Sequence, residues 1–487
     1  MYYPSKKDFI KLSKKGNLIP VYKEIEADLE TPVSSFLKID EGDYSYLLES
    51  VEGEANIARF SFLGANPSLV FKSKGRDIEI TENKKVRRFR TDSDPLDEIK
   101  KVMRQFKFVK VNGLPRFSGG LVGYLGYDMI RFFEDIPDKN PDDLKTPDAV
   151  FMLTDTLLIF DHVMHKIKII SNAHIKANPS AVYDEAVAKI DKISRMLSKR
   201  AVKEAKRPKT SSKITVKSNF TQKAFEDMVV KGKKYIKNGD IIQVVLSQRL
   251  EADLGGKDPF SIYRGLRSIN PSPYMYYLKL KNVRLIGSSP EIMVRCEDRN
   301  IELRPIAGTR PRGRSEAEDI KLEKELLADP KEKAEHIMLV DLGRNDIGRV
   351  ADFNSVKVAE LMRIEKYSHV MHIVSDVVGR LSKNRDGFDL VRASFPAGTV
   401  SGAPKIRAME IIDELETRKR GTYAGCVGYF SFSGNIDTCI TIRTILVKDN
   451  KAYVQAGAGI VADSKPAKEY HETLNKARAL IKAIEEA

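Results

Sequence analysis

A basic segment near the middle of the chain sets the first constraint on how the chain can fold. Residues 199–213 contain seven Lys and Arg against one acid, Glu204, together with Pro208 and a Thr-Ser-Ser run. Such a segment has too little apolar surface to be buried, so it predicts a linker. Because 487 residues are several times the size of an average domain, we expect two large units, residues 1–205 and 213–487, or one elaborate fold.

The net charge of +15 raises the question of a nucleic-acid partner, since a basic surface is the footprint of phosphate binding. Six of these charges, seven positive less one negative, lie in residues 199–213, and no RNP-type aromatic run, helix-turn-helix pattern or zinc spacing accompanies them. We interpret the charge mainly as solvated surface and predict no nucleic-acid partner. A secondary role is to attract a doubly anionic substrate. A basic nucleic-acid-binding protein stays the alternative from another class.

The three cysteines predict a reducing compartment. Cys296, Cys426 and Cys439 are widely separated and have no CxxC spacing. The first residues lack the apolar region of a signal peptide, and the most apolar window, residues 149–160, is interrupted by polar residues. We therefore expect a cytoplasmic protein without a membrane partner.

Hydrophobic periodicity predicts a mixture of helices and strands on both sides of the linker. Residues 44–49 and 156–161 have the pattern of strands, and residues 181–197 have apolar positions at helical spacing. After the linker, residues 221–237 predict an amphipathic helix and residues 241–248 a β-branched strand.

One loop has the composition of an anion site. In residues 303–313 an apolar lead enters the pair Gly308-Thr309, where backbone N–H groups can approach a small ligand closely. Three arginines flank this corner and predict carboxylate recognition: Arg304, Arg310 and Arg312. Taken by itself, the same composition is also that of a solvated turn.

Two pairs of glutamates share helical spacing. A capping signal at Ser315 predicts a helix that continues through Glu332 and Glu335, which are three residues apart and so lie on one face. The last helix repeats the arrangement with Glu469 and Glu472. Facing pairs of this kind suit Mg²⁺, which binds few carboxylates and keeps water. The alternative is that either pair simply faces solvent.

Two glycine-rich turns accompany these helices. Residues 396–405 predict a helix that begins at Ser401 or Gly402, and residues 455–460 predict a strand end that a ligand can approach. We expect Ser464 to cap the last helix. The spacing of a P-loop is missing, so ATP chemistry is not expected.

Together these segments resemble the chorismate-utilising enzymes, and most closely the large subunits of anthranilate synthases. The motifs occur in the family's order: residues 46–50, 119–128, 303–313, 334–346, 396–405, 437–443 and 455–472. The resemblance implies an α+β fold, in which helices surround a large two-sheet β-sandwich core and an N-terminal α/β region is interlocked with it. That region would carry part of a regulatory tryptophan site, and residues 213–487 would bind chorismate.

The resemblance also implies a reaction. Ammonia adds at C2 of chorismate, the C4 hydroxyl leaves, and pyruvate is eliminated to give anthranilate, the first step of tryptophan biosynthesis. Glu335 and Glu472 would bind Mg²⁺, with Glu332 and Glu469 assisting through water. The substrate would contact Gly308, Thr309, Tyr423, Arg443, Gly457, Ala458 and Gly459.

Two residues would carry protons in this reaction. Glu291 matches the acid that protonates the departing hydroxyl, and His372 matches the base that removes the C2 proton. Thr399 would line the same pocket. Their sequence patterns alone favour a turn residue for Glu291 and a core histidine for His372, and the resemblance reverses that preference.

Two positions distinguish the members of the family. Relatives that add water at C2 carry a lysine where this chain has Gln243, and those that aminate C4 carry a lysine where it has Ala307. Both positions favour amination at C2.

The resemblance implies two further ligands. The chain has no glutaminase motif, so a separate glutamine amidotransferase subunit is expected to supply ammonia. Tryptophan is expected as a feedback inhibitor, in a pocket formed by Ser50, Asn270, Pro273, Tyr274 and Met275. Tyr276 stands where phenylalanine is common in the family. A catalytically inactive tryptophan sensor on the same fold is the other alternative.

Overall fold

The computed structural model describes residues 1–50, 59–199, 214–367 and 370–487. Apart from its first residue, the predicted linker at residues 199–213 lies outside this part of the chain, so the boundary between residues 205 and 213 stays a prediction. Within the described ranges, no helix has the length and apolar character needed to cross a membrane.

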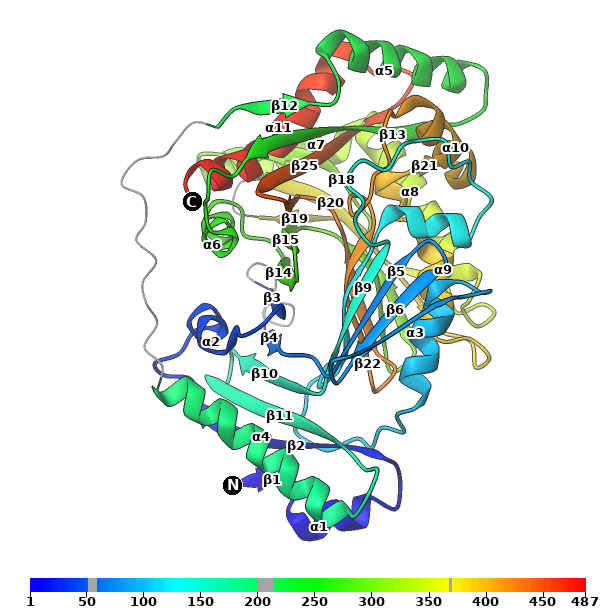
Figure 1. Ribbon diagram of the computed structural model, residues 1–487. Coiled ribbons are helices and arrows are strands. Elements are labelled where there is room, and N and C mark those ends of the chain that lie inside the picture. Colours follow the sequence, from blue (N-terminus) through cyan, green and yellow to red (C-terminus); the bar gives the residue numbers. More distant parts are fainter. Residues whose placement is uncertain (51–58, 200–213, 368–369) are drawn as a thin grey trace.

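Two large antiparallel sheets form the body of the molecule (Figure 1). The first sheet joins the two halves of the sequence where β3 pairs with β14, with Tyr46 opposite Leu278. In order across the sheet, its described strands are β1 (Tyr2–Tyr3), β2 (Leu18–Glu26), β11 (Lys166–His174), β10 (Thr156–Asp161), β4 (Phe60–Ala65), β3 (Tyr44–Glu49), β14 (Tyr274–Leu280), β15 (Val283–Ser289), β24 (Thr444–Lys448), β25 (Lys451–Ile460), β13 (Gln243–Asp253) and β12 (Val216–Ser218), and β21 (Gly402–Ala403) pairs with β13.

The second sheet also combines strands from both halves. Its described strands are β18 (Ile306–Pro311), β20 (Val370–Arg380), β17 (Asn300–Leu303), β16 (Ile292–Glu297), β23 (Ile436–Ile440), β22 (Cys426–Ser431), β8 (Gly120–Leu125), β9 (Ala149–Thr154), β5 (Leu69–Lys74), β6 (Asp77–Glu82) and β7 (Lys85–Arg90), with β19 (Lys357–Lys366) paired to β20. The halves meet where Gly123 of β8 lies opposite Gly428 of β22. The predicted interlocking of the N-terminal region with the core is confirmed.

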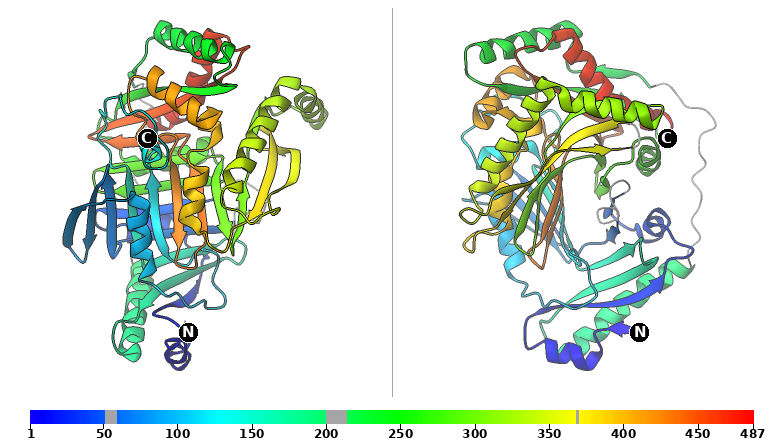
Figure 2. Two further views of the ribbon diagram at one scale, coloured as in Figure 1. Left: turned by 90° about the vertical axis from the view of Figure 1, so that its right-hand side faces the viewer. Right: turned by 180° about the vertical axis from the view of Figure 1, so that it is seen from behind.

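Helices cover the outer faces of the sheets (Figures 1 and 2). They are α1 (Lys6–Leu12), α2 (Pro32–Ile39), α3 (Pro95–Arg104), α4 (Pro179–Lys199), α5 (Gln222–Lys237), α6 (Pro259–Ile269), α7 (Glu316–Ala328), α8 (Pro330–Gly348), α9 (Gly387–Ser394), α10 (Lys405–Leu415) and α11 (Pro466–Glu485), with 3₁₀ turns η1 (Tyr127–Phe132) and η2 (Gly398–Val400). Helix α4 packs on β2 and β11, whereas α5 and α11 pack on β13 and β25 at the opposite end of the molecule.

The core has a layer of apolar side chains between the two sheets. Tyr46 and Tyr276 of the first sheet meet Val122 and Tyr429 of the second there. Further apolar clusters lie under the outer helices. Because the central strands are covered on both faces, every residue of β8 and β9 is buried, which explains their continuous apolar sequence. The predicted α+β class with a two-sheet core is confirmed.

Several predicted elements are found at their expected positions. The strands at residues 44–49 and 156–161 are β3 and β10, and the helix at residues 181–197 lies within α4. Thr221 caps α5, because its side chain accepts a hydrogen bond from the N–H of Ala224. The strand predicted at residues 241–248 is β13, which begins at Gln243 and extends to Asp253.

The prediction of one continuous helix from Ser315 through Glu335 is wrong. Ser315 does cap α7, but this helix ends at Ala328 and α8 begins at Pro330. Pro330 cannot donate a hydrogen bond to the preceding turn. The side chain of Asp329 accepts from the N–H groups of Lys331 and Glu332, so it caps a new helix.

Two predicted helix starts are also displaced. Helix α10 begins at Lys405 after Pro404 at its N-cap, because Gly402–Ala403 is the short strand β21. Helix α11 has Lys465 at its N-cap, and the hydroxyl of Ser464 accepts from the N–H of Val461 instead. Because β21 and Pro404 separate η2 from α10, the turn that carries Thr399 is not the N-terminus of α10.

Candidate active site

A cavity of about 610 Å³ opens between the C-terminal half of the first sheet, strand β18 and helices α8 and α11. Fourteen of the fifteen residues predicted as catalytic, substrate-binding or metal-binding line it: Gln243, Glu291, Gly308, Thr309, Glu332, Glu335, His372, Thr399, Tyr423, Arg443, Gly457, Gly459, Glu469 and Glu472. The fold thus brings together segments that are more than 200 residues apart in the sequence.

Ala458 is the predicted residue that does not line the cavity. Side chains alternate along β25, so Gly457 and Gly459 face the cavity while the fully buried Ala458 packs in the cluster under α5 and α10. Its side chain therefore cannot contact a ligand there.

Glycines allow the close packing of the cavity wall. A Cβ atom at Gly457 would lie 2.8 Å from the hydroxyl of Tyr423, and one at Gly459 would lie 2.6 Å from Nε2 of Gln243. Gly308 has φ of +74° at a bulge in the pairing of β18 with β20. A side chain at Gly457 or Gly459 would displace a residue that lines the cavity, and one at Gly308 would be strained by the positive φ.

Glu291 is a buried acid in the connection between β15 and β16. It is 7% exposed, and burial raises its pKa to about 8, although the Thr399 hydroxyl and the N–H of Ile306 oppose part of this shift. At neutral pH the carboxyl group is therefore mainly protonated. This is the state that a general acid needs.

His372 on β20 is a base, in contrast to the acid Glu291. Its Nδ1 lies 3.0 Å from the carbonyl oxygen of Gly308, which can only accept a hydrogen bond, so Nδ1 carries the hydrogen and Nε2 is left with a lone pair. Burial is the main cause that lowers the pKa of this imidazole, and Arg443 adds to the effect. The ring is thus a neutral base on the wall of the cavity.

The cations of the cavity are not the three arginines that flank the Gly-Thr corner, so that prediction is wrong. Arg304 binds Glu365 and Asp376, Arg310 binds Asp329, and Arg312 binds Asp319. Their charges are neutralised by protein carboxylates, because the corner packs against α7 and β19.

Arg443 and Lys476 face the cavity instead. NH1 of Arg443 donates to the carbonyl of Lys476, and Lys476 Nζ donates to Glu472 at 2.7 Å and to the carbonyl of Gly457 at 3.0 Å. Lys476 was missed in the sequence. Its position four residues after Glu472 on one helix face is the signal that could have found it.

The four glutamates approach the cavity from two helices. Burial raises the pKa of Glu332 and of Glu469, and the neighbouring Glu335 and Glu472, respectively, contribute to these shifts. Gln243 Nε2 donates to Glu335 Oε1 at 2.9 Å. Among the described residues, no three His, Cys, Asp or Glu side chains lie close enough to hold a metal ion by themselves. The oxygen donors suit Mg²⁺, but water and a substrate carboxylate would have to complete its coordination.

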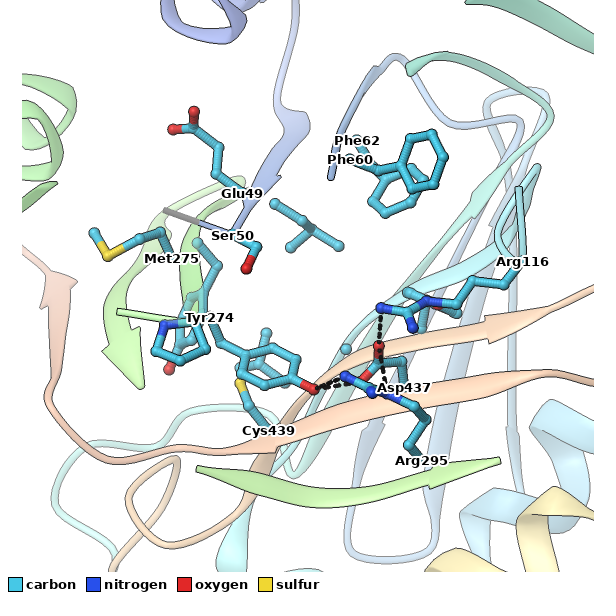
Figure 3. A pocket seen from close by; sticks show the side chains of 16 residues that line it. Glu49, Ser50, Phe60, Phe62, Arg116, Tyr274, Met275, Arg295, Asp437 and Cys439 are labelled. Carbon is cyan, nitrogen blue, oxygen red and sulfur yellow. Dashed lines mark hydrogen bonds and ion pairs between the residues drawn. The ribbon is translucent and has the colours of Figure 1, made fainter. Parts of the chain in front are cut away.

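A second, smaller pocket of about 60 Å³ lies between the sheets (Figure 3). Four of the residues predicted for the inhibitor line it: Ser50, Pro273, Tyr274 and Met275. Asn270 does not line this pocket, and its amide donates to Ser288 Oγ at 2.9 Å, so its contact with the inhibitor stays a prediction. Arg116, Arg295 and the Tyr274 hydroxyl all bind Asp437 or one another on one side, as Figure 3 shows.

Comparison with known proteins agrees with this arrangement. The family model of chorismate binding enzymes matches residues 44–482. Anthranilate synthase component 1 of Acetivibrio thermocellus is 52% identical over 100% of this chain and 99% of its own length, and that of Aquifex aeolicus is 52% identical over 98% and 96%. The crystal structure of anthranilate synthase component I from Streptococcus pneumoniae TIGR4 superimposes with a TM-score of 0.78, at 39% identity, over 94% of this chain and 99% of that one.

The fold and the cavity are thus those of a chorismate-utilising enzyme. The chain belongs to the chorismate-binding enzyme family and, within it, to the anthranilate synthase component 1 group. The predicted family membership is confirmed.

Proposed function

We propose that this chain aminates chorismate at C2 with ammonia and then eliminates pyruvate to give anthranilate. The observation that carries the proposal is the pairing in one cavity of a protonated buried acid, Glu291, with a neutral base, His372. Two groups with opposite protonation suit a reaction that gives a proton to one atom and removes a proton from another.

Each residue then has a task that its position supports. Glu291 protonates the C4 hydroxyl as it leaves, because its neutral form still holds a proton at neutral pH. His372 takes the C2 proton at Nε2 during pyruvate loss. Arg443 binds the enolpyruvyl carboxylate, and Gly308 and Thr309 hold the substrate through their backbone. Thr399 lines the wall beside Glu291.

Two positions support amination at C2 over the related reactions. Gln243 is neutral and bound to Glu335, so it cannot act as the base that would activate water. Ala307 carries no nucleophile toward C4. Ammonia needs neither group, because it is itself a nucleophile.

We propose that Mg²⁺ is bound by Glu335 and Glu472, with Glu332 and Glu469 acting through water. When bound, the ion would hold the ring carboxylate of chorismate and withdraw electrons from the ring. Because the glutamates lie on opposite helices and line one cavity, the substrate itself would complete the site.

We further propose a cytoplasmic enzyme that receives ammonia from a glutamine amidotransferase subunit. The three cysteines are free and buried, which suits a reducing compartment. Ammonium at alkaline pH should replace the subunit, since free ammonia can enter the open cavity directly.

The first test is the reaction itself. The purified chain is given chorismate, Mg²⁺ and an ammonium salt at mildly alkaline pH, and anthranilate fluorescence and pyruvate are followed together. We expect both products in equal amounts. Failure to consume chorismate, with the ammonium salt and also with a glutaminase subunit and glutamine, would refute the proposal and favour an inactive sensor.

Tryptophan is the proposed occupant of the second pocket and a feedback inhibitor. Phe60, Phe62 and Met275 give it apolar walls, and Ser50 Oγ is buried without a hydrogen-bond partner in the described chain, so it is available to a ligand.

We predict that Ser50→Phe fills the second pocket and raises the tryptophan concentration for half-inhibition by about 10-fold or more. The kcat without tryptophan should be unchanged, because Ser50 does not line the active cavity. Inhibition curves of the parent and the variant check this. An unchanged inhibition constant would place the inhibitor elsewhere.

A further inference from the structure

A fully buried arginine lies behind the wall of the active cavity. Arg420, between α10 and β22, is 2% exposed, and it binds the 5% exposed Glu416 through Nε at 3.0 Å and NH2 at 2.6 Å. Burying two charges is costly unless their remaining hydrogen-bonding groups are also satisfied. The hydrogen-bond partners of Arg420 and Glu416 therefore identify the segments that this ion pair holds in place.

Three of these contacts reach the cavity wall. NH1 of Arg420 donates to the carbonyl of Val400 at 2.7 Å, next to Thr399, and NH2 donates to the carbonyl of Val245 at 2.8 Å, two residues after Gln243. The guanidinium carbon lies 5.4 Å from the ring centroid of Tyr423. Val245, Val400 and Tyr423 line the cavity, whereas Arg420 does not.

Glu416 extends the contacts to a further strand. Its Oε1 accepts from the N–H of Ser247 at 2.9 Å and from the Ser247 hydroxyl at 2.7 Å. Gln455 of β25, another residue that lines the cavity, donates to the same hydroxyl at 2.8 Å. The ion pair therefore connects β13, β25, the turn η2 and Tyr423.

The N-terminal region completes the arrangement. Tyr127 of η1 has its ring centroid 4.8 Å from the Arg420 guanidinium carbon, and its N–H donates to the carbonyl of Gly421 at 2.7 Å. Asp128 accepts from the N–H of Gly421 at 3.1 Å. These two residues end the motif at residues 119–128, to which the reaction proposed above assigns no role.

We propose that Arg420 and Glu416 are positioning residues, which hold Tyr423 and the turn that carries Thr399 in the geometry that the reaction requires. Tyr127 and Asp128 fix this unit from the N-terminal region, so both halves of the chain shape the active cavity. The proposal rests on the proposed function for its kinetic consequences, and on the contacts alone for its structural ones.

A double variant separates positioning from stability. Replacing a buried ion pair by apolar residues of similar volume often leaves stability unchanged or raises it, whereas removing one partner strands a buried charge. Arg420→Met with Glu416→Leu should therefore keep a higher Tm than Arg420→Met alone, although it leaves the carbonyls of Val245 and Val400 and the N–H of Ser247 without partners. Its kcat for anthranilate formation should nevertheless fall by about 100-fold, because small displacements of substrate-positioning groups have effects of this size.

Further variants serve as controls. Arg420→Lys keeps the charge but cannot reach Val245, Val400 and Glu416 together, so we expect a lower Tm and, at a temperature where the variant is folded, about a 10-fold lower kcat. Arg392, which binds Asp94 and Asp97 between α9 and α3, is the matched ion-paired arginine away from the cavity. Arg392→Met should change Tm but not kcat.

Two outcomes would overturn the positioning role. One is a double variant that folds and keeps the parent's kcat and KM. If the double variant does not fold, an Arg420→Lys variant with the parent's kcat would overturn the positioning role instead. The other is a crystal structure of the double variant, or of Arg420→Lys in its place, with Tyr423 and residues 398–400 undisplaced. The second readout needs no activity, so it remains decisive if the parent makes no anthranilate, which would refute the proposed function separately.

Discussion

Glu291→Gln is expected to lower kcat for anthranilate formation by about 1,000-fold, because an amide of the same shape cannot give a proton to the leaving hydroxyl. Binding of chorismate should change little, since the amide side chain fills the same space as the carboxyl group. The exposed Glu297 on the neighbouring strand β16 offers the matched control, and Glu297→Gln should keep the parent's kcat. A Glu291→Gln variant with more than a tenth of the parent's kcat would show that the acid lies elsewhere.

The pH dependence of the parent enzyme tests the role of Glu291 as the acid independently of the variant. Glu291 acts in its protonated form, and its pKa is raised to about 8, so activity should persist through neutral pH and fall as pH rises through about 8. The measurement is kcat/KM for chorismate against pH, with the ammonium salt adjusted to keep free ammonia constant. A decline centred near pH 4.5, the ordinary value for a glutamate, would contradict the assignment.

Glu335→Ala and Glu472→Ala are each expected to lower Mg²⁺-dependent activity by about 100-fold or more, which corresponds to ~3 kcal/mol of transition-state stabilisation. The two residues come from α8 and α11, so both helices would be needed to bind the proposed ion. Titration with Mg²⁺ should show a higher half-saturating concentration for either variant.

The control for this prediction is Glu486→Ala at the C-cap of α11, which does not line the cavity and should behave as the parent. Activity of the parent that survives complete removal of divalent ions by a chelator would contradict the metal site. Unchanged Mg²⁺ dependence in Glu335→Ala would leave the ion somewhere other than between α8 and α11.

The local sequence pattern was sufficient to predict where most helices and strands lie, but it was not sufficient to predict the residues at which they begin and end. Thr221 and the apolar spacing that follows it determine α5 wherever it packs. The break between α7 and α8 depended on one capping aspartate before a proline, Asp329 and Pro330, inside an otherwise helical pattern. The start of α10 was displaced because Gly402 and Ala403 pair with β13, and no local pattern contains that partner.

The candidate site likewise has features that the local sequence predicts and features that depend on the fold. The helical spacing of Glu332 and Glu335 could be read directly, but the opposition of α8 and α11 is a long-range result of the fold, and only the family resemblance predicted it. The arginines of the Gly-Thr corner were misassigned because composition does not show which carboxylates lie nearby. The side chain of Ala458 faces away from the cavity because alternation along β25 turns it away from its glycine neighbours, so its predicted contact with the substrate stays a prediction for its backbone.

Product analysis with ¹⁵N-ammonium tests the central claim most directly. The intact chain is incubated with chorismate, Mg²⁺ and the labelled salt, and the product is identified by NMR and mass spectrometry. Amination at C2 predicts anthranilate with ¹⁵N on the ring carbon next to the carboxyl-bearing carbon, and one pyruvate for each anthranilate. A 4-amino product that keeps its enolpyruvyl group, or unlabelled isochorismate, would contradict the claim and the discrimination assigned to Gln243 and Ala307.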